Sequence, residues 1–230
     1  MSGIGQLVGA IYTLTENTEI SPDIPFSLPA GYTFIIPEGL TLTINGVFVW
    51  NGTLIVHGAL INNSIQIDTN KPQARTSVYG TIQNNGGIVL PNLVLEASGN
   101  IITTDAATTI CPGDNQLNGT VDLQGTATFT LPSGSTTAVA GVISLSSTST
   151  VHNSGATTIT GSISGNGTLT NDGSIIAPGG SVTPTITGNP LTNPVSEVVP
   201  ETPGTTSEVV PETPVATSDA VAEPPVTTET

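Results

Sequence analysis

Three consecutive six-residue blocks constrain the fold of this chain more than any other feature. They fill residues 46–63, and each begins with a glycine: Gly46, Gly52 and Gly58. Large apolar residues follow two positions after each glycine, and in the first two blocks also four positions after it; they are Phe48, Trp50, Leu54, Val56 and Leu60. This alternation is typical of β-strands whose side chains point in turn into and away from a core.

A block this short cannot bury its apolar side alone, so it must stack on other copies of itself. The same spacing returns later in the chain, where the glycines are Gly155, Gly161, Gly167 and Gly173. We therefore predict an all-β, single-chain β-solenoid (β-helix), with these seven glycines as repeat turns and the five apolar residues as structural core. We expect about seven or eight coils of ~18–20 residues, with Leu54 and Leu60 in one buried column.

Changes in composition divide the chain into three segments. In residues 1–30, Pro22, Pro25 and Pro29 interrupt any long strand, and we predict an N-terminal cap or attachment arm there. Residues 31–188 contain the β-helix repeats. Residues 189–230 contain an acidic, proline-rich sequence that begins at Ser196 and recurs at Ser207. Proline prevents regular pairing and the acids repel one another, so we predict a disordered tail.

The charge balance restricts the partners of the chain. There are 17 acidic residues but only two basic ones, Lys71 and Arg75, which gives a net charge of −15. Nucleic acids and anionic membrane surfaces are bound by Lys and Arg, so we predict no nucleic-acid partner. No apolar run approaches the ~20 residues of a membrane span, and the N-terminal residues lack the basic start of a secretory signal. The single cysteine, Cys111, is interpreted as a structural residue.

Side chains capable of catalysis are scattered over separate segments. They are Asp105, Asp114, Asp122, Asp172, His57 and His152. Enzymes that cut polysaccharides need a base beside metal-holding carboxylates, or two carboxylates at a fixed distance. The sequence contains no phosphate-binding loop, no Ser-His-Asp order and no metal motif. We predict no enzymatic activity, no cofactor and no metal site, and no cleft that joins two or more of these six side chains.

Threonines separated by one residue raise ice binding as an alternative function. Such pairs occur at Thr41/Thr43, Thr126/Thr128/Thr130 and Thr168/Thr170, and they would line a flat face of a solenoid. Threonine is also the usual polar residue on the outside of a β-strand. Because the spacing between these pairs is irregular, the sequence does not favour ice binding.

Several repeats resemble those of a known class of surface proteins. The segments Asn51-Gly52-Thr53-Leu54, 165–175 (GNGTLTNDGSI) and 177–181 (APGGS) are similar to the Gly/Asn/Thr repeats of surface β-helix proteins. Bacterial autotransporter passengers and related adhesins contain such repeats, and so do structural proteins of large DNA viruses and phages. The resemblance implies a surface scaffold rather than one particular activity.

With no export signal expected, we predict a virion component that forms a rigid β-helical rod for assembly or attachment. Its partners would be the other structural proteins of the particle, or further copies of the same chain. The alternative is an adhesin on a cell surface. Ice binding and a carbohydrate-active enzyme are less favoured.

Overall fold

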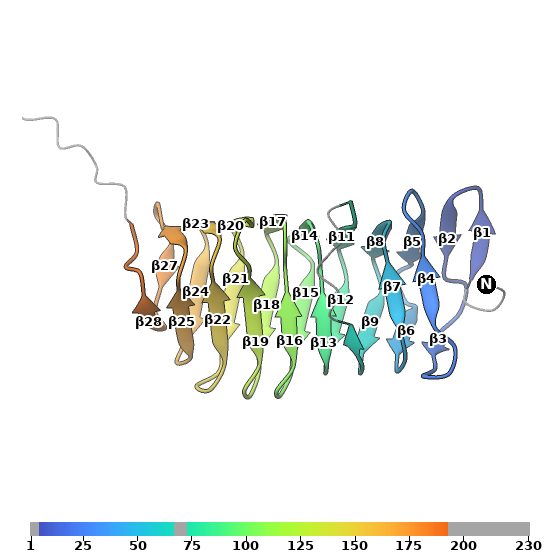
Figure 1. The fold of residues 1–230 in the computed structure, drawn as a ribbon, viewed down its shortest axis with the longest axis horizontal. Coiled ribbons are helices and arrows are strands. Elements are labelled where there is room, and N and C mark those ends of the chain that lie inside the picture. Colours follow the sequence, from blue (N-terminus) through green and yellow to red (C-terminus); the bar gives the residue numbers. More distant parts are fainter. Residues whose placement is uncertain (1–4, 67–72, 193–230) are drawn as a thin grey trace, which may run out of the picture. The chain divides into compact units, whose positions relative to one another are not determined.

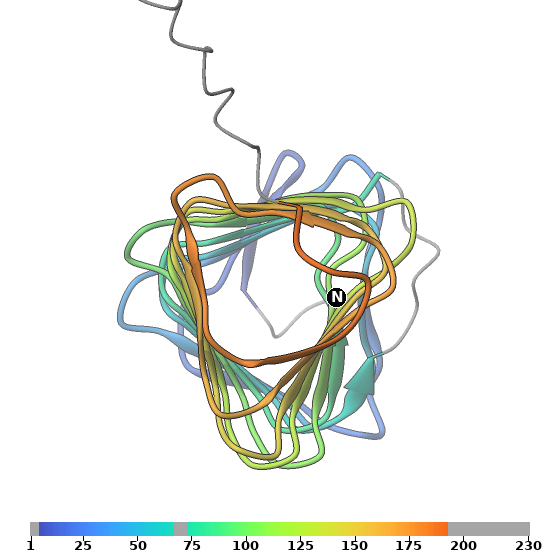
Figure 2. The ribbon, with the colours of Figure 1, turned by 90° about the vertical axis from the view of Figure 1, so that its left-hand side faces the viewer.

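The computed structural model describes residues 5–66 and 73–192, and these residues form a β-solenoid without any helix. After the first strand, the strands follow one another in sets of three, and each set makes one coil. Nine coils are stacked along one axis (Figure 1). Seen along that axis the coils are triangular, with three flat sides and loops at the corners (Figure 2). We name the three sides faces A, B and C in the order in which the chain reaches them.

Face A is a ten-stranded sheet that runs the length of the solenoid. Its strands are β1 (Gln6–Val8), β2 (Ile11–Thr13), β5 (Thr33–Ile36), β8 (Thr53–Val56), β11 (Arg75–Val78), β14 (Leu93–Leu95), β17 (Asp114–Leu117), β20 (Thr136–Val139), β23 (Ala156–Ile159) and β26 (Ser174–Ile176). All neighbours pair in parallel except β1, which is antiparallel to β2 at the N-terminal edge.

Face B is a nine-stranded parallel sheet. It consists of β3 (Thr18–Ile20), β6 (Thr41–Ile44), β9 (Ala59–Asn62), β12 (Thr81–Asn84), β15 (Asn100–Thr103), β18 (Thr120–Leu123), β21 (Val142–Leu145), β24 (Ser162–Gly165) and β27 (Ser181–Val182).

Face C contains two sheets, one above the other. The first pairs β4 (Phe26–Leu28) with β7 (Phe48–Trp50). The second consists of β10 (Ile65–Gln66), β13 (Gly87–Val89), β16 (Thr108–Ile110), β19 (Thr128–Leu131), β22 (Thr150–Asn153), β25 (Thr168–Asn171) and β28 (Thr185–Gly188).

The unit that stacks is the whole coil, not the six-residue block. The first of the three blocks of residues 46–63 supplies β7, the last side of one coil. The other two blocks supply β8 and β9, the first two sides of the next coil. Leu54 therefore lies on face A above Phe34, whereas Leu60 lies on face B above Leu42. The expectation that Leu54 and Leu60 share one column was wrong, because the chain turns a corner between them. The five core residues named from the sequence are each no more than 2% exposed.

The repeat glycines lie at corners, where successive coils come closest. A Cβ built on Gly52 would overlap the carbonyl oxygen of Tyr32 in the preceding coil, and one on Gly58 would overlap those of Pro37 and Leu40. Gly46, Gly155, Gly161, Gly167 and Gly173 meet the preceding coil in the same way. Glycine is thus required here for close approach of two backbones.

The solenoid begins earlier and contains more coils than expected. Strands β2, β3 and β4 pair in parallel with the second coil, so residues 11–28, assigned above to a cap or arm, supply the first coil. Pro22, Pro25 and Pro29 lie between strands, where the missing amide hydrogen costs no ladder bond. At the other end Thr192 still bridges to Ile176. Residues 189–192, assigned above to the disordered tail, are therefore part of the solenoid, and the rest of the predicted tail, from 193 onward, lies outside the described residues, as does Lys71.

Candidate functional site

The most regular outward-facing surface lies on face C, over strands β16 to β28. One column of outward side chains contains only threonine, in register from strand to strand: Thr108, Thr128, Thr150, Thr168 and Thr185. The second column, two residues further along each strand, contains Ile110, Thr130, His152, Thr170 and Thr187. We call the eight threonines of these two columns the threonine array.

Corner loops of different lengths hide this array in the sequence. Its first-column threonines are separated by 20, 22, 18 and 17 residues, yet each pairs directly with the next. The extra residues lie in the corners, so the strands keep their register. The irregular spacing that argued against a threonine face is therefore a property of the loops. Of the pairs named from the sequence, Thr41/Thr43 lie on face B and Thr126 lies at a corner.

The structure brings together two of the six side chains considered for catalysis. His152 Nε2 lies 2.9 Å from Asp172 Oδ2, and these side chains are 39% and 59% exposed. His57 instead stacks on Tyr79, with ring centroids 4.6 Å apart. Asp122 accepts a hydrogen bond from Gln124 Nε2 at 2.7 Å. An exposed His–Asp pair on a strand surface lacks the enclosed, water-excluding setting in which acid–base pairs are tuned.

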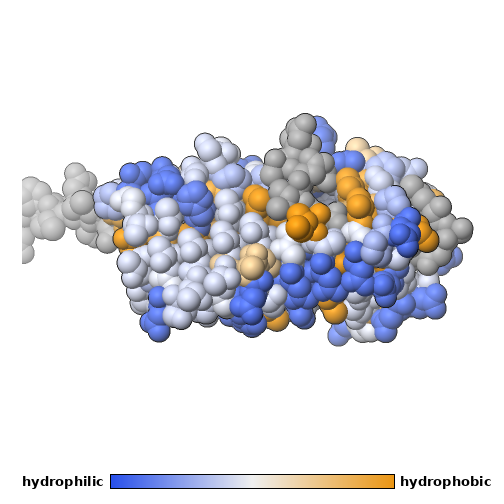
Figure 3. Space-filling view, turned by 60° about the horizontal axis from the view of Figure 1, so that its bottom comes forward, coloured by the Kyte–Doolittle hydropathy of each residue, from blue (hydrophilic) through white to orange (hydrophobic). Residues whose placement is uncertain are grey.

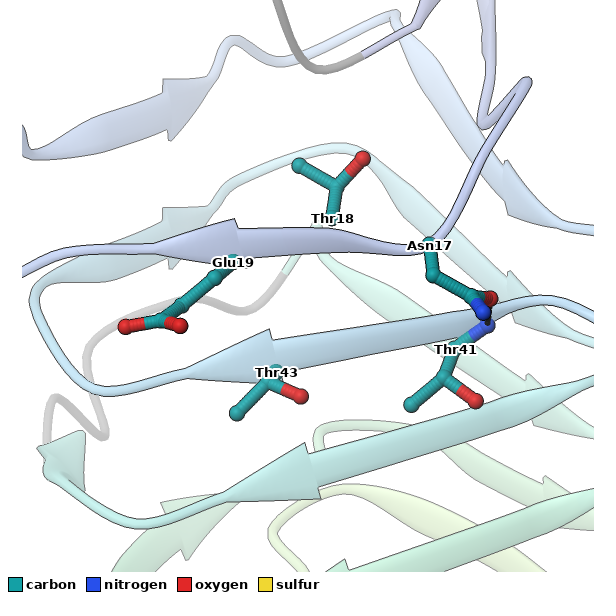
Figure 4. Close-up of a pocket in the computed structure, with 5 residues that line it drawn as sticks. All are labelled: Asn17, Thr18, Glu19, Thr41 and Thr43. Carbon is teal, nitrogen blue, oxygen red and sulfur yellow. Dashed lines mark hydrogen bonds between the residues drawn. The ribbon is translucent and has the colours of Figure 1, made fainter.

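Two shallow grooves each contain one carboxylate. The larger, about 370 Å³, is lined by Asn63, Ile65, Asn85, Gly86, Gly87, Asp105, Ala106 and Thr108. The other, about 340 Å³, is lined by Asn17, Thr18, Glu19, Thr41 and Thr43 (Figure 4). In the second, Asn17 Oδ1 accepts a hydrogen bond from the Thr41 amide at 2.8 Å. Among the described residues, no three His, Cys, Asp or Glu side chains gather where they could hold a metal ion.

A ladder of exposed amides runs along the corner between faces B and C. Asn63 Nδ2 donates to Asn45 Oδ1, and Asn85 Nδ2 donates to Asn63 Oδ1, each at 2.7 Å. Asn45 extends the ladder to Glu19, and Thr104 closes it on Asn85. Each member directly follows or lies within a face B strand. The ladder ties five coils together at this corner.

A second set of polar side chains lies inside the solenoid, at positions that the alternating pattern predicts to be apolar. Asn62 Nδ2 donates to Asn84 Oδ1 at 2.9 Å, and Asn84 Nδ2 donates to Thr109 Oγ1 at 3.0 Å. A similar network, further along the axis, joins Thr157, Asn153 and Asn171. The feature of the sequence that marks this network is an asparagine at the last, inward-pointing position of a strand. Each amide here bonds to groups of its own and the next coil.

Cys111 is fully buried, and this burial raises the pKa of its thiol far above the ordinary value. The thiolate is the reactive form, so we expect no reaction with a disulfide reagent at pH 8 in the folded protein. In denaturant the pKa returns to its usual range and one thiol per chain should react. Absorbance of the released thiol product measures both. Rapid labelling of the folded protein would contradict the buried position.

Comparison with known proteins adds no family. No protein-family model matches the chain, and neither the curated proteins nor the solved structures contain a match. Within residues 5–66 and 73–192, no helix is long and apolar enough to cross a membrane.

Proposed function

We propose that this protein is a structural protein of a virion surface, in which the solenoid acts as a rigid rod for assembly or attachment. The observation that carries the proposal is the unbroken stack of nine coils around one apolar core. At a strand spacing of about 4.8 Å such a stack extends about 40 Å. Neighbouring coils are joined by ladders on faces A and B along the whole rod, and on face C everywhere except between β7 and β10, so bending the rod would break many hydrogen bonds at once.

The N-terminal end of the rod offers a surface for attachment. Strand β1 is an edge strand, and Leu7, Val8 and Ile11 of the β1–β2 hairpin are 46%, 66% and 46% exposed. An exposed apolar edge strand is a ready template for pairing with another chain. We propose that this hairpin contacts the neighbouring structural protein of the particle, or a second copy of the chain.

The experiment compares two variants for incorporation into particles. Val8→Asp places a charge on the exposed edge, and Val142→Asp places one on an exposed position of face B. Both should fold with unchanged circular dichroism, because both side chains are exposed. We expect quantitative mass spectrometry of purified particles to find the wild type and Val142→Asp in stoichiometric amounts and Val8→Asp strongly depleted. Recovery of the wild type only from a cell-surface fraction would favour the adhesin instead, and recovery only as free protein would contradict both.

A further inference from the structure

The threonine array presents hydroxyl and methyl groups on a two-dimensional grid. Neighbouring strands of a sheet are about 4.8 Å apart, and alternate residues of one strand are about 6.6–6.8 Å apart. Eight of the ten outward positions on strands β16, β19, β22, β25 and β28 are threonine. Water oxygens on the flat faces of hexagonal ice repeat at closely similar distances. From this match we propose that the threonine array is an ice-binding surface, a function separate from the rod role above.

Threonine suits this ligand because it offers two kinds of contact. Its hydroxyl both donates and accepts a hydrogen bond, so it can replace a water molecule in an ordered layer. Its methyl group promotes an ordered water cage and carries no charge. Ice presents donors and acceptors over its whole surface, so many weak contacts in register are needed. A strand-by-strand repeat supplies them.

The array is rigid before any ligand arrives. The β-branched side chain of threonine has restricted χ1, and each inner threonine is flanked by neighbours from the coils on both sides. Thr128, Thr150 and Thr168 are accordingly only partly exposed. Thr187 Oγ1 donates to Thr170 Oγ1 at 3.2 Å, a contact between successive members of the second column. Side chains fixed in advance lose little conformational entropy on binding.

Acidic residues are numerous in this chain, and one of them, Asp172, contacts the array through His152. None of the ten outward positions is acidic, whereas face A carries Asp114 and face B carries Asp122 at outward positions. In Figure 3, residues of near-neutral hydropathy fill the middle of the C-terminal half of the visible surface, with strongly hydrophilic residues at its upper and lower margins, whereas hydrophilic and hydrophobic residues lie side by side over the N-terminal half. A strongly hydrated charge would disturb ordered water, so its absence from these positions fits ice rather than a polar macromolecule.

His152 is the one titratable interruption of the array, and it allows a test by gain of function. It occupies the second column between Thr130 and Thr170, and its ring bonds to the exposed Asp172. An exposed pair of this kind contributes little to stability. His152→Thr would therefore give the second column four consecutive threonines, from position 130 to position 187, without loss of folding, and we expect it to increase ice binding.

The experiment measures the fraction of fluorescently labelled full-length protein taken up into a slowly growing ice hemisphere, together with inhibition of ice recrystallisation. Thr150→Lys and Thr168→Lys each place a bulky charge in the array. Matched controls are Thr136→Lys and Thr158→Lys, which lie on face A of the same two coils. Circular dichroism and thermal unfolding verify that all five variants are folded.

We expect the wild type and both face A controls to enter the ice, the array variants to fall to the level of serum albumin, and His152→Thr to exceed the wild type. Exclusion of the folded wild type from ice would overturn the proposal, as would equal loss in the array and control variants. Array-dependent binding to crystalline cellulose or chitin by a protein excluded from ice would also overturn it, and would assign the surface to a polysaccharide. None of these outcomes bears on the rod role, which is tested by incorporation into particles.

Discussion

Leu60→Asp is expected to lower the free energy of unfolding by about 4 kcal/mol or more. Leu60 is fully buried on face B, where its neighbours in register are Leu42 below and Ile82 above, both also fully buried. The carboxylate would find no partner in this column, and the loss of the leucine would leave a cavity beside it. Urea denaturation followed by circular dichroism measures the change.

Two comparisons make this prediction specific to the column. Ile61→Asp changes the next residue of the same strand, which points outward between Thr43 and Gln83, and should cost much less. Leu54→Asp should fall between the two, because Leu54 lies beside Thr76, whose buried hydroxyl makes no hydrogen bond with the described residues and could donate to the new carboxylate. Equal losses at positions 60 and 61 would contradict the inward and outward assignment of this strand.

Alternation and glycine spacing were sufficient to predict the solenoid class. Phe48, Leu54 and Leu60 fall two residues after a glycine because each strand starts just past a corner, and that local rule is visible in the sequence. The path of the chain around the corners is not local. Nothing within a six-residue block shows whether the next block stacks above it or lies on the adjacent side, so the column assignment of Leu54 and Leu60 failed.

The threonine array could not be derived from the sequence for a related reason. Thr150 and Thr168 are neighbours only because the corner loops of that coil are shorter than those of the coil before it. Register depends on hydrogen bonds between residues about twenty positions apart, and a search at constant spacing misses it. The sequence shows which residues are threonines, but it does not show that their side chains lie on one face of the solenoid.

Buried asparagines show a different limit of sequence reasoning. Asparagine is frequent in turns because it tolerates a left-handed backbone, and this preference alone favours turn positions. Asn62 and Asn84 instead end face B strands with their amides inside the core. A polar group can be buried without penalty only where partners exist, and here the partner is the same residue type one coil away. That partner is apparent only once the register is known.

Asn84→Leu is expected to destabilise the protein by about 1–3 kcal/mol, although leucine has a similar size and is apolar. The Asn84 amide bonds to Asn62, to the Thr108 carbonyl, to Thr109 Oγ1 and to the Gly86 amide hydrogen. Removing it leaves these groups short of partners inside the core, and the penalty comes from those unsatisfied groups rather than from the lost volume. Thermal and urea unfolding measure the change.

A double-mutant cycle separates the network from simple packing. Asn62→Leu combined with Asn84→Leu removes both members of the pair, so the double variant should lose clearly less than the sum of the single losses. The matched control is Asn85→Leu, which alters the exposed ladder at the adjacent position, where water can replace the lost bonds and the cost should stay within about 0.5 kcal/mol. Strict additivity of the two buried substitutions would show that each amide is stabilised by its own coil, and that the bond between Asn62 and Asn84 contributes nothing to the stacking of coils.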